Sequence, residues 1–141
     1  MNKLFWLIMI TTIVISSGCN SDIVTTEQLR MLEYKCVYIA PLNSDDPQVG
    51  QVLRDAIQQE LLRKRIAICD PNTATVLITG STFLTTRGTA SSSGQSIESV
   101  SLVGKNISGE IILSASYDNK DRLSASKLAQ EFGSALADKL K

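Results

Sequence analysis

A strand, a helix and a second strand are predicted one after another in the first half of the chain, and this order restricts the fold more than any other feature. Residues 35–42, KCVYIAPL, are nearly all apolar and rich in β-formers, which is typical of a strand covered on both faces. Asp46 and Pro47 have the residue types of a helix cap and first helical position, and apolar residues recur at helical spacing over residues 47–64. Residues 66–70, IAICD, predict the second strand. We therefore expect a parallel pair of strands with a right-handed helical crossover.

The second half of the chain predicts three more strands and a final helix. The strands are expected over residues 75–86, 97–103 and 107–117, and the last of them has the alternation of a half-solvated antiparallel strand. After Ser124, apolar residues recur at helical spacing, so this helix is expected to pack on the same sheet face as the first. The predicted fold class is α+β: a two-layer sandwich of order β-α-β-β-β-β-α, with two helices on one face of a mixed sheet.

The amino terminus has the pattern of a cleaved leader. Residues 4–15, LFWLIMITTIVI, follow Lys3 and are about a dozen in number, whereas a bilayer-spanning helix needs roughly 20. Small residues then lead into Cys19, which resembles the lipobox of bacterial lipoproteins, where the cysteine is acylated, with palmitate among its chains, and becomes the first residue. That box usually has Leu, Val or Ile three places before the cysteine, where this chain has Ser16. The alternative is an ordinary cleaved signal followed by an unmodified cysteine.

These patterns divide the chain into three parts. Residues 1–18 are predicted to be a lipoprotein signal peptide, residues 19–34 a lipidated tether with one short helical turn, and residues 35–141 a single α/β domain. By resemblance to lipobox proteins, Asn20 after the cysteine implies sorting to the outer membrane. The expected location is therefore the periplasmic face of the bacterial outer membrane, with the lipid at Cys19 as the contact with the membrane.

The composition argues against an enzyme. The chain contains no histidine, so the commonest general base, the usual Ser-His-Asp triad and the usual zinc sites are missing from it. Asp45 and Asp46 offer oxygen ligands, but helix capping explains them, and we expect no metal site and no cofactor. Without Lys3, the mature chain has 14 − 1 = 13 basic and 14 acidic residues, a net charge of −1. Nucleic-acid binding therefore has little electrostatic support.

Residues at the ends and at fixed positions of the predicted strands and helix suggest a family. They are Pro41, Gly50, Leu53, Asp70, Ala74 and the run VLITG that ends at Gly80. In this pattern the chain resembles the small α/β domain of several bacterial envelope lipoproteins: the curli-secretion lipoprotein family, the amino-terminal domain of TolB and penicillin-binding-protein activator lipoproteins. The LPS-assembly lipoprotein has a similar order of elements. The resemblance implies a non-catalytic accessory or binding module in envelope assembly with an envelope protein as partner; the alternative is a lipid or glycolipid binding or transport lipoprotein.

Two cysteines fall in the predicted parallel strands. In an oxidising periplasm, Cys36 and Cys69 can form a disulfide. If the two strands run in similar register, however, the cysteines lie about three residues apart along the strands, roughly 10 Å and beyond bridging reach. We therefore expect two buried free thiols, with the disulfide as the alternative.

A polar segment near the middle of the chain is the predicted binding surface. Residues 87–96, RGTASSSGQS, have too few apolar residues to pack and predict a mobile loop. Loops on a rigid scaffold often carry binding residues, and an exposed sheet edge there can accept a partner strand. The predicted partner-binding residues are Thr85, Thr86, Arg87, Ser92, Gln95 and Glu98. One alternative is a simple hairpin connection; another places the partner on the exposed face of the first helix, around Gln51, Arg54, Asp55 and Gln58.

Overall fold

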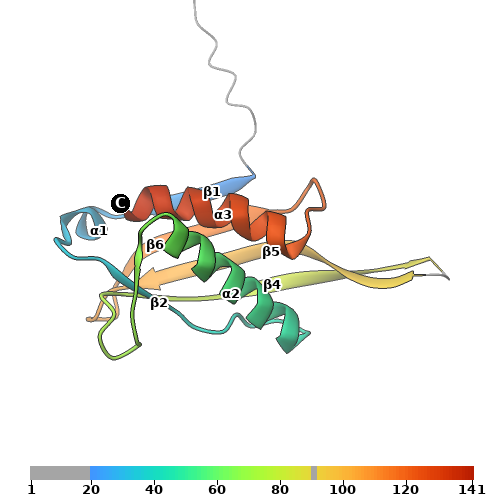
Figure 1. Cartoon of the computed structure of the whole chain (residues 1–141), viewed down its shortest axis with the longest axis horizontal. Helices are drawn as coiled ribbons and strands as arrows, with labels where there is room; N and C mark the ends of the chain where they lie inside the picture. Colours follow the sequence, from blue (N-terminus) through green and yellow to red (C-terminus); the bar gives the residue numbers. More distant parts are fainter. Residues whose placement is uncertain (1–19, 90–91) are drawn as a thin grey trace, which may run out of the picture.

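The structure, a computed structural model that describes residues 20–89 and 92–141, contains one mixed six-stranded sheet and three helices in that part of the chain (Figure 1). The strand order is β1-β6-β5-β4-β2-β3. The elements are β1 Ser21–Thr25, α1 Glu27–Met31, β2 Cys36–Ile39, α2 Pro47–Arg63, β3 Ala67–Ile68, β4 Val76–Thr89, β5 Ser92–Lys105, β6 Ile111–Asp118 and α3 Ala125–Leu140. The predicted signal peptide and Cys19 lie outside the described residues.

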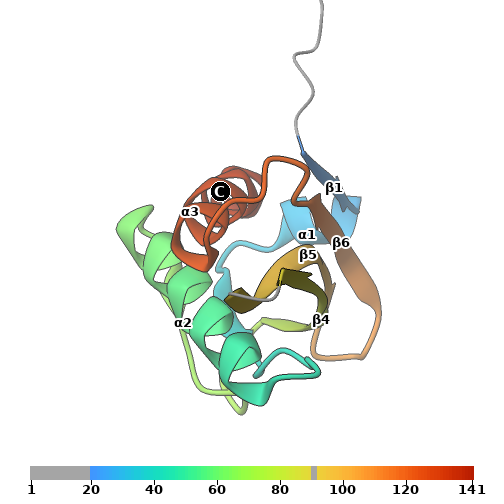
Figure 2. The same ribbon diagram turned by 90° about the vertical axis from the view of Figure 1, so that its right-hand side faces the viewer.

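The predicted α+β two-layer sandwich is confirmed. Helices α2 and α3 lie together on one side of the sheet (Figure 2). Strands β2 and β3 are parallel, as the crossover predicts, whereas β5 is antiparallel to both β4 and β6. No helix in the described ranges is both long and apolar enough to cross a bilayer.

Both long helices begin at the predicted caps. The side chain of Asp46 accepts a hydrogen bond from the amide of Gln48 at 3.0 Å, and Pro47 occupies the first helical position, where its missing N–H is not needed. The side chain of Ser124 accepts from the amide of Lys127 at 3.3 Å at the start of α3. Local capping chemistry thus set both boundaries.

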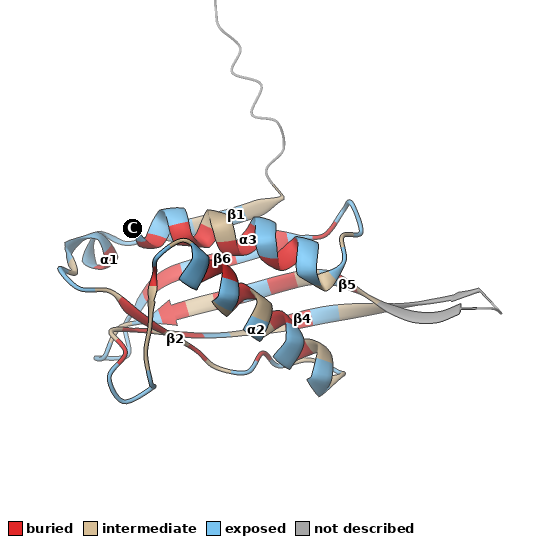
Figure 3. Cartoon of the chain, viewed as in Figure 1, coloured by how far each residue is buried: buried red, intermediate tan, exposed pale blue. Residues whose placement is uncertain are grey.

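The core fills the space between the helices and the sheet (Figure 3). Phe132 of α3 is fully buried, and its ring centroid lies 5.6 Å from that of Tyr117 on β6. Other fully buried apolar residues from both layers are Val37, Ile39, Leu53, Ile57, Leu61, Ile78, Leu102, Leu128 and Leu136. The apolar stripes of the helices and the alternating strand residues therefore meet in one layer.

The segment predicted as a tether is part of the fold. Strand β1 pairs with β6 in antiparallel register from Ser21 opposite Tyr117 to Thr25 opposite Leu113. Leu29 of α1 is fully buried in the core. The expected helical turn is present as α1, but the strand before it was not predicted, because a five-residue edge strand carries little apolar periodicity of its own.

The predicted loop at residues 87–96 is wrong. Strand β4 continues to Thr89 and β5 begins at Ser92, with Arg87 opposite Gly94 and Thr89 opposite Ser92. The absence of apolar residues did not prevent strand formation, because main-chain hydrogen bonds hold an antiparallel ladder together without buried side chains. The result is a long hairpin that projects beyond the helices (Figure 1).

Strand β6 begins later than predicted. Residues 106–110 form a turn, in which Asn106 Oδ1 accepts hydrogen bonds from the amides of Ser108 and Glu110 at 3.0 and 2.9 Å. The strand alternation placed Ile107 and Ile111 on the buried face, but they are 81 % and 58 % exposed. The expected inward positions from Leu113 to Tyr117 are buried.

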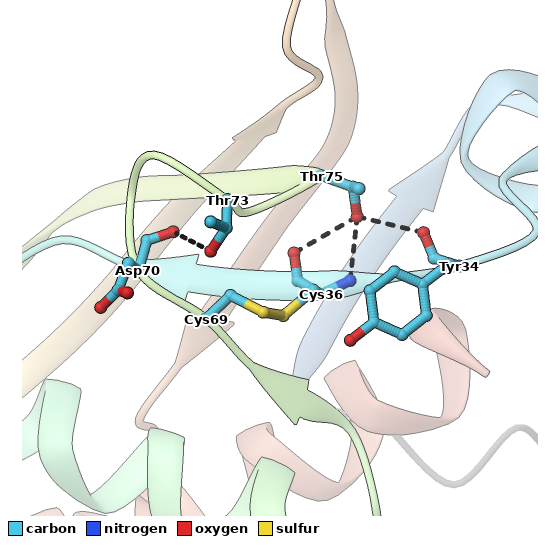
Figure 4. Close-up of a disulfide and its surroundings, with 6 residues drawn as sticks. All are labelled: Tyr34, Cys36, Cys69, Asp70, Thr73 and Thr75. Atoms are coloured by element: carbon cyan, nitrogen blue, oxygen red, sulfur yellow. Dashed lines mark hydrogen bonds between the residues drawn. A yellow bond between two sulfur atoms is a disulfide. The ribbon is translucent and has the colours of Figure 1, made fainter.

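The prediction of two free thiols is also wrong, because Cys36 and Cys69 form a disulfide (Figure 4). Cys36 is paired with Ala67, so Cys69 is two residues beyond the partner of Cys36 rather than three, and its amide still donates to the carbonyl of Val37 at 2.9 Å. The two Cα atoms are 5.6 Å apart, within the usual range for a disulfide. The 10 Å expectation assumed an offset of three residues between the two cysteines.

Candidate binding surface

Strands β4 and β5 extend beyond the rest of the sheet. On the β5 edge, β6 pairs only from Ser99 onward. On the β4 edge, the last neighbour is Asn43, which forms a bridge with Ser81 and accepts a hydrogen bond from the Thr82 amide at 2.8 Å. Residues 84–89 and 92–97, which we call the overhang, pair only with each other within the described parts of the chain. Both outer edges of this two-stranded ribbon are therefore without a neighbouring strand.

All six predicted binding residues lie on the overhang or at its base. Thr85 is opposite Ser96, with 3.1 Å between the two hydroxyl oxygens, and Thr86 is opposite Gln95. Glu98 is the extra residue where the register shifts, since Phe83 pairs with Ser99 and Leu84 with Ile97. The side chains of Thr86, Arg87, Ser92 and Gln95 lie outside the described part of the structure. The pairing of β4 with β5 thus brings the backbones of the predicted residues together in one hairpin.

A buried asparagine fixes the base of the overhang. Asn119, only 6 % exposed, donates from Nδ2 to the carbonyl of Ile97 at 2.8 Å, and its amide donates to the carbonyl of Glu98 at 2.9 Å. Its Oδ1 accepts from the amide of Leu123 at 2.8 Å. No local sequence pattern marks Asn119, because its partners on β5 lie about twenty residues earlier in the chain. The base of the overhang is therefore held to the turn after β6 by hydrogen bonds.

The sheet face opposite the helices is rich in hydroxyl groups. Register aligns Asp22, Ser116, Ser101 and Ser81 across four strands, and a second row contains Val24, Ser114, Val103 and Thr79. The centre of this face carries small side chains and no charge, and Ser101, Ser114 and Ser116 are exposed. The sequence predicted this character for β6 from its alternating serines.

The alternative surface on the first helix borders a hollow of about 430 Å³ between α2 and the edge of β2. Arg54 lies there, with Nε donating to the carbonyl of Ile39 at 2.8 Å and Nη1 2.8 Å from Asp55. Its guanidinium carbon is 6.0 Å from the centre of the Tyr38 ring. Arg54 thus caps a β2 carbonyl that no strand reaches, which gives it a structural role.

The hydroxyl of Tyr117 holds a contact between β6 and α3. Burial raises the pKa of the Tyr117 hydroxyl above its ordinary value, the hydrogen bond to Glu131 raises it further, and Asn20 opposes these effects. Tyr117 therefore stays protonated at neutral pH and donates to Glu131 at 2.9 Å. In residues 20–89 and 92–141 there is no group of three or more Cys, Asp or Glu side chains placed to hold a metal ion.

No protein-family model matches the chain, and no curated protein sequence matches it. Solved structures do share its fold. The PelC dodecamer from Paraburkholderia phytofirmans aligns with a TM-score of 0.60 at 12 % identity, over 86 % of this chain and 98 % of that one. A PelC variant dodecamer from the same organism gives 0.57 at 13 % identity, over 85 % and 96 %. A PDZ domain protein from Parabacteroides distasonis gives 0.51 at 11 % identity, over 83 % of this chain and 34 % of that one. At such identities the likeness concerns the fold alone.

Proposed function

We propose that this protein is a periplasmic lipoprotein, anchored in the bacterial outer membrane through Cys19, that acts as a non-catalytic binding module in envelope assembly. The observation that carries the binding role is the overhang, in which two paired strands leave the sheet with both edges open. The leader-like residues 1–18 and the following cysteine support the anchored location. The resemblance to envelope lipoproteins supports the accessory role.

The overhang favours a partner that binds through its main chain. An isolated two-stranded ribbon is marginally stable in water, and its unpaired N–H and C=O groups provide a template for another strand. A partner strand added to the β5 edge before Ile97 or to the β4 edge beyond Thr82 would extend the sheet without requiring apolar contacts. This mode suits a segment composed mainly of Ser, Thr and Gly.

Self-association is one form that this binding can take, since the PelC chains that share the fold are dodecamers. Light scattering of the purified protein distinguishes the two kinds of partner. A mass above that of one chain indicates self-association, and the mass of one chain indicates a different envelope protein. A lipid or glycolipid carrier is less favoured, because the layer between sheet and helices is filled by large side chains such as Leu53 and Phe132. Native mass spectrometry after gentle extraction would reveal a copurifying lipid.

Shortening the hairpin is expected to reduce partner capture at least tenfold. Replacing residues 88–95 by a two-residue Asn-Gly turn keeps Leu84 and Ile97, which contact the core, but removes most of the open edges. The thermal midpoint should stay within a few degrees of wild type, because the deleted residues lie outside the sheet body. Capture from detergent-solubilised envelopes, quantified by mass spectrometry, measures the effect.

Gln51→Ala, on the exposed side of α2, is the matched control and should capture the partner like wild type. If the shortened protein captures the partner normally while Gln51→Ala does not, the binding site is on α2 and the proposal for the overhang is wrong.

Cys19→Ala, expressed behind an ordinary cleavable signal peptide, is expected to move the protein from the membrane fraction to the soluble periplasm. Acyl chains at this cysteine would supply the hydrophobic anchor of the mature chain, and each buried methylene contributes about 0.8 kcal/mol. The domain should remain folded, because the sheet and the core are formed by Ser21 and later residues. Cell fractionation measures the distribution, and wild-type recovery of the mature variant in membranes would refute the anchor.

A further inference from the structure

The strand position beside β4 is occupied only as far as Asn43. The carbonyls of Ile78 and Gly80 each accept a hydrogen bond at 2.9 Å from the segment in this position, and the Thr82 amide donates to Asn43. Even-numbered residues of β4 therefore direct their main-chain groups to this edge, because alternate residues of a strand face opposite neighbours. After Asn43 the chain turns away to begin α2. Leu84, the next residue that faces this edge, consequently has no strand beside it in the described parts of the chain.

A hollow of about 220 Å³ lies where this edge becomes free. It is lined by Asn43, Ser44, Asp45, Ser81, Thr82 and Phe83. Phe83 is 59 % exposed, although it is a large apolar side chain. The Oγ atom of Ser44 is buried and has no hydrogen-bond partner within the described residues. Buried hydroxyl groups are normally hydrogen-bonded, so a donor is missing at this point of the hollow.

The surroundings of the hollow are acidic. Asp45 is exposed, and no ion pair between described side chains involves it. Residues 43–59, which lead into α2 and form most of it, contain three acidic residues and one basic residue, a net charge of −2. The basic residue, Arg54, is already bonded to Asp55. No Lys or Arg belongs to the described lining of the hollow. A cationic group is therefore its complementary occupant.

We propose that the β4 edge beside this hollow accepts an extended segment of a partner protein, and that a lysine or arginine side chain of this segment occupies the hollow. The main chain of the segment pairs with Leu84. Its cationic group lies against the Phe83 ring, whose face attracts cations, and beside the Asp45 carboxylate. It also donates the missing hydrogen bond to Ser44. This inference rests on the binding role in the proposed function and adds the edge and the chemistry of the partner.

The strands of this chain offer little that could fill the hollow of a second copy. Among the described strands, basic residues occur only at Arg87 and Lys105. Lys105 is paired on both sides, with Leu77 of β4 and Ile111 of β6, so it is not at a free edge. Only Arg87 of the overhang remains for self-association. The charge of the hollow therefore favours a different protein as the source of the basic segment.

Four synthetic peptides test the chemistry of the hollow. They have the sequence Thr-Val-Thr-X-Thr-Val-Thr with both ends capped, and X is Lys, Arg, Gln or Glu. Fluorescence anisotropy measures their binding to the full chain purified in mild detergent. The Lys and Arg peptides should bind roughly fivefold more tightly than the Gln peptide, and the Glu peptide should bind more weakly than the Gln peptide.

Three variants locate the preference. Asp45→Asn should bind the Lys and Gln peptides alike, and Phe83→Ala should bind the Lys and Arg peptides roughly threefold more weakly than wild type. Asp138→Asn, which removes an exposed carboxylate from α3, is the matched control and should behave like wild type. A preference for Lys that survives Asp45→Asn, or equal binding of the Lys, Gln and Glu peptides, overturns the cation site. No binding of any peptide at millimolar concentration overturns strand addition at this edge.

These outcomes are distinguishable from failure of the proposed function. Replacing residues 88–95 leaves Leu84 and the hollow in place. Loss of envelope capture in that variant, combined with no peptide preference in wild type, leaves the overhang as the binding surface and overturns only the cation site. Normal capture by the shortened protein argues against the overhang, whatever the peptides do. A dimer in light scattering that Asp45→Asn dissociates would identify the occupant as a second copy and overturn the partner class proposed here.

Discussion

Phe132→Ala is expected to lower the free energy of unfolding by about 3–5 kcal/mol, the usual cost of removing a buried aromatic ring. The Phe132 side chain of α3 is completely buried against the sheet, and its ring centroid lies 5.6 Å from that of Tyr117. The replacement removes this contact. The surrounding helix and strand residues cannot all move to fill the space, so a cavity remains. Urea unfolding followed by circular dichroism measures the change.

Phe83→Ala is the control for this variant, because Phe83 is the same residue type but 59 % exposed at the open face of the sheet. Its stability should stay within about 0.5 kcal/mol of wild type. Equal losses for the two variants would mean that the core between α3 and the sheet is not packed as described.

The double replacement Cys36→Ala and Cys69→Ala is expected to lower the free energy of unfolding by about 3–4 kcal/mol. The disulfide closes a loop with a sequence separation of 33, and its removal restores the conformational freedom of that loop in the unfolded chain. For a domain of this size the melting temperature should fall by roughly 10–15 °C. Differential scanning calorimetry measures the shift.

Reductant provides the control for the disulfide. Wild-type protein should lose a similar amount of stability when it is unfolded in excess dithiothreitol, whereas the double variant should not respond. Two alkylatable thiols in unfolded, non-reduced wild-type protein, apart from Cys19, would contradict the bond.

Sequence predicted the parts of this fold whose signals are local. The cap at Asp46, the proline after it and the apolar stripe of α2 lie within a few turns of one helix, so their spacing could be read directly. The same holds for Ser124 and α3. The six residues predicted for partner binding were also neighbours along the chain, and the hairpin that contains them is formed by consecutive strands. Whether a partner uses them stays a prediction.

Tertiary structure decided the features that depend on pairing between distant segments. Strand β1 pairs with β6, about 90 residues later in the chain. The five residues Ser21–Thr25 contain no pattern that predicts this pairing. The bond between Cys36 and Cys69 depends on the register of β3 against β2, which no local pattern specified. Sequence by itself therefore determined the helices, the central strands and their faces, because side-chain periodicity and capping act over a few residues. Register, the edge strand and the disulfide were decided by contacts between segments, because strand pairing is specified only when both partners are in place.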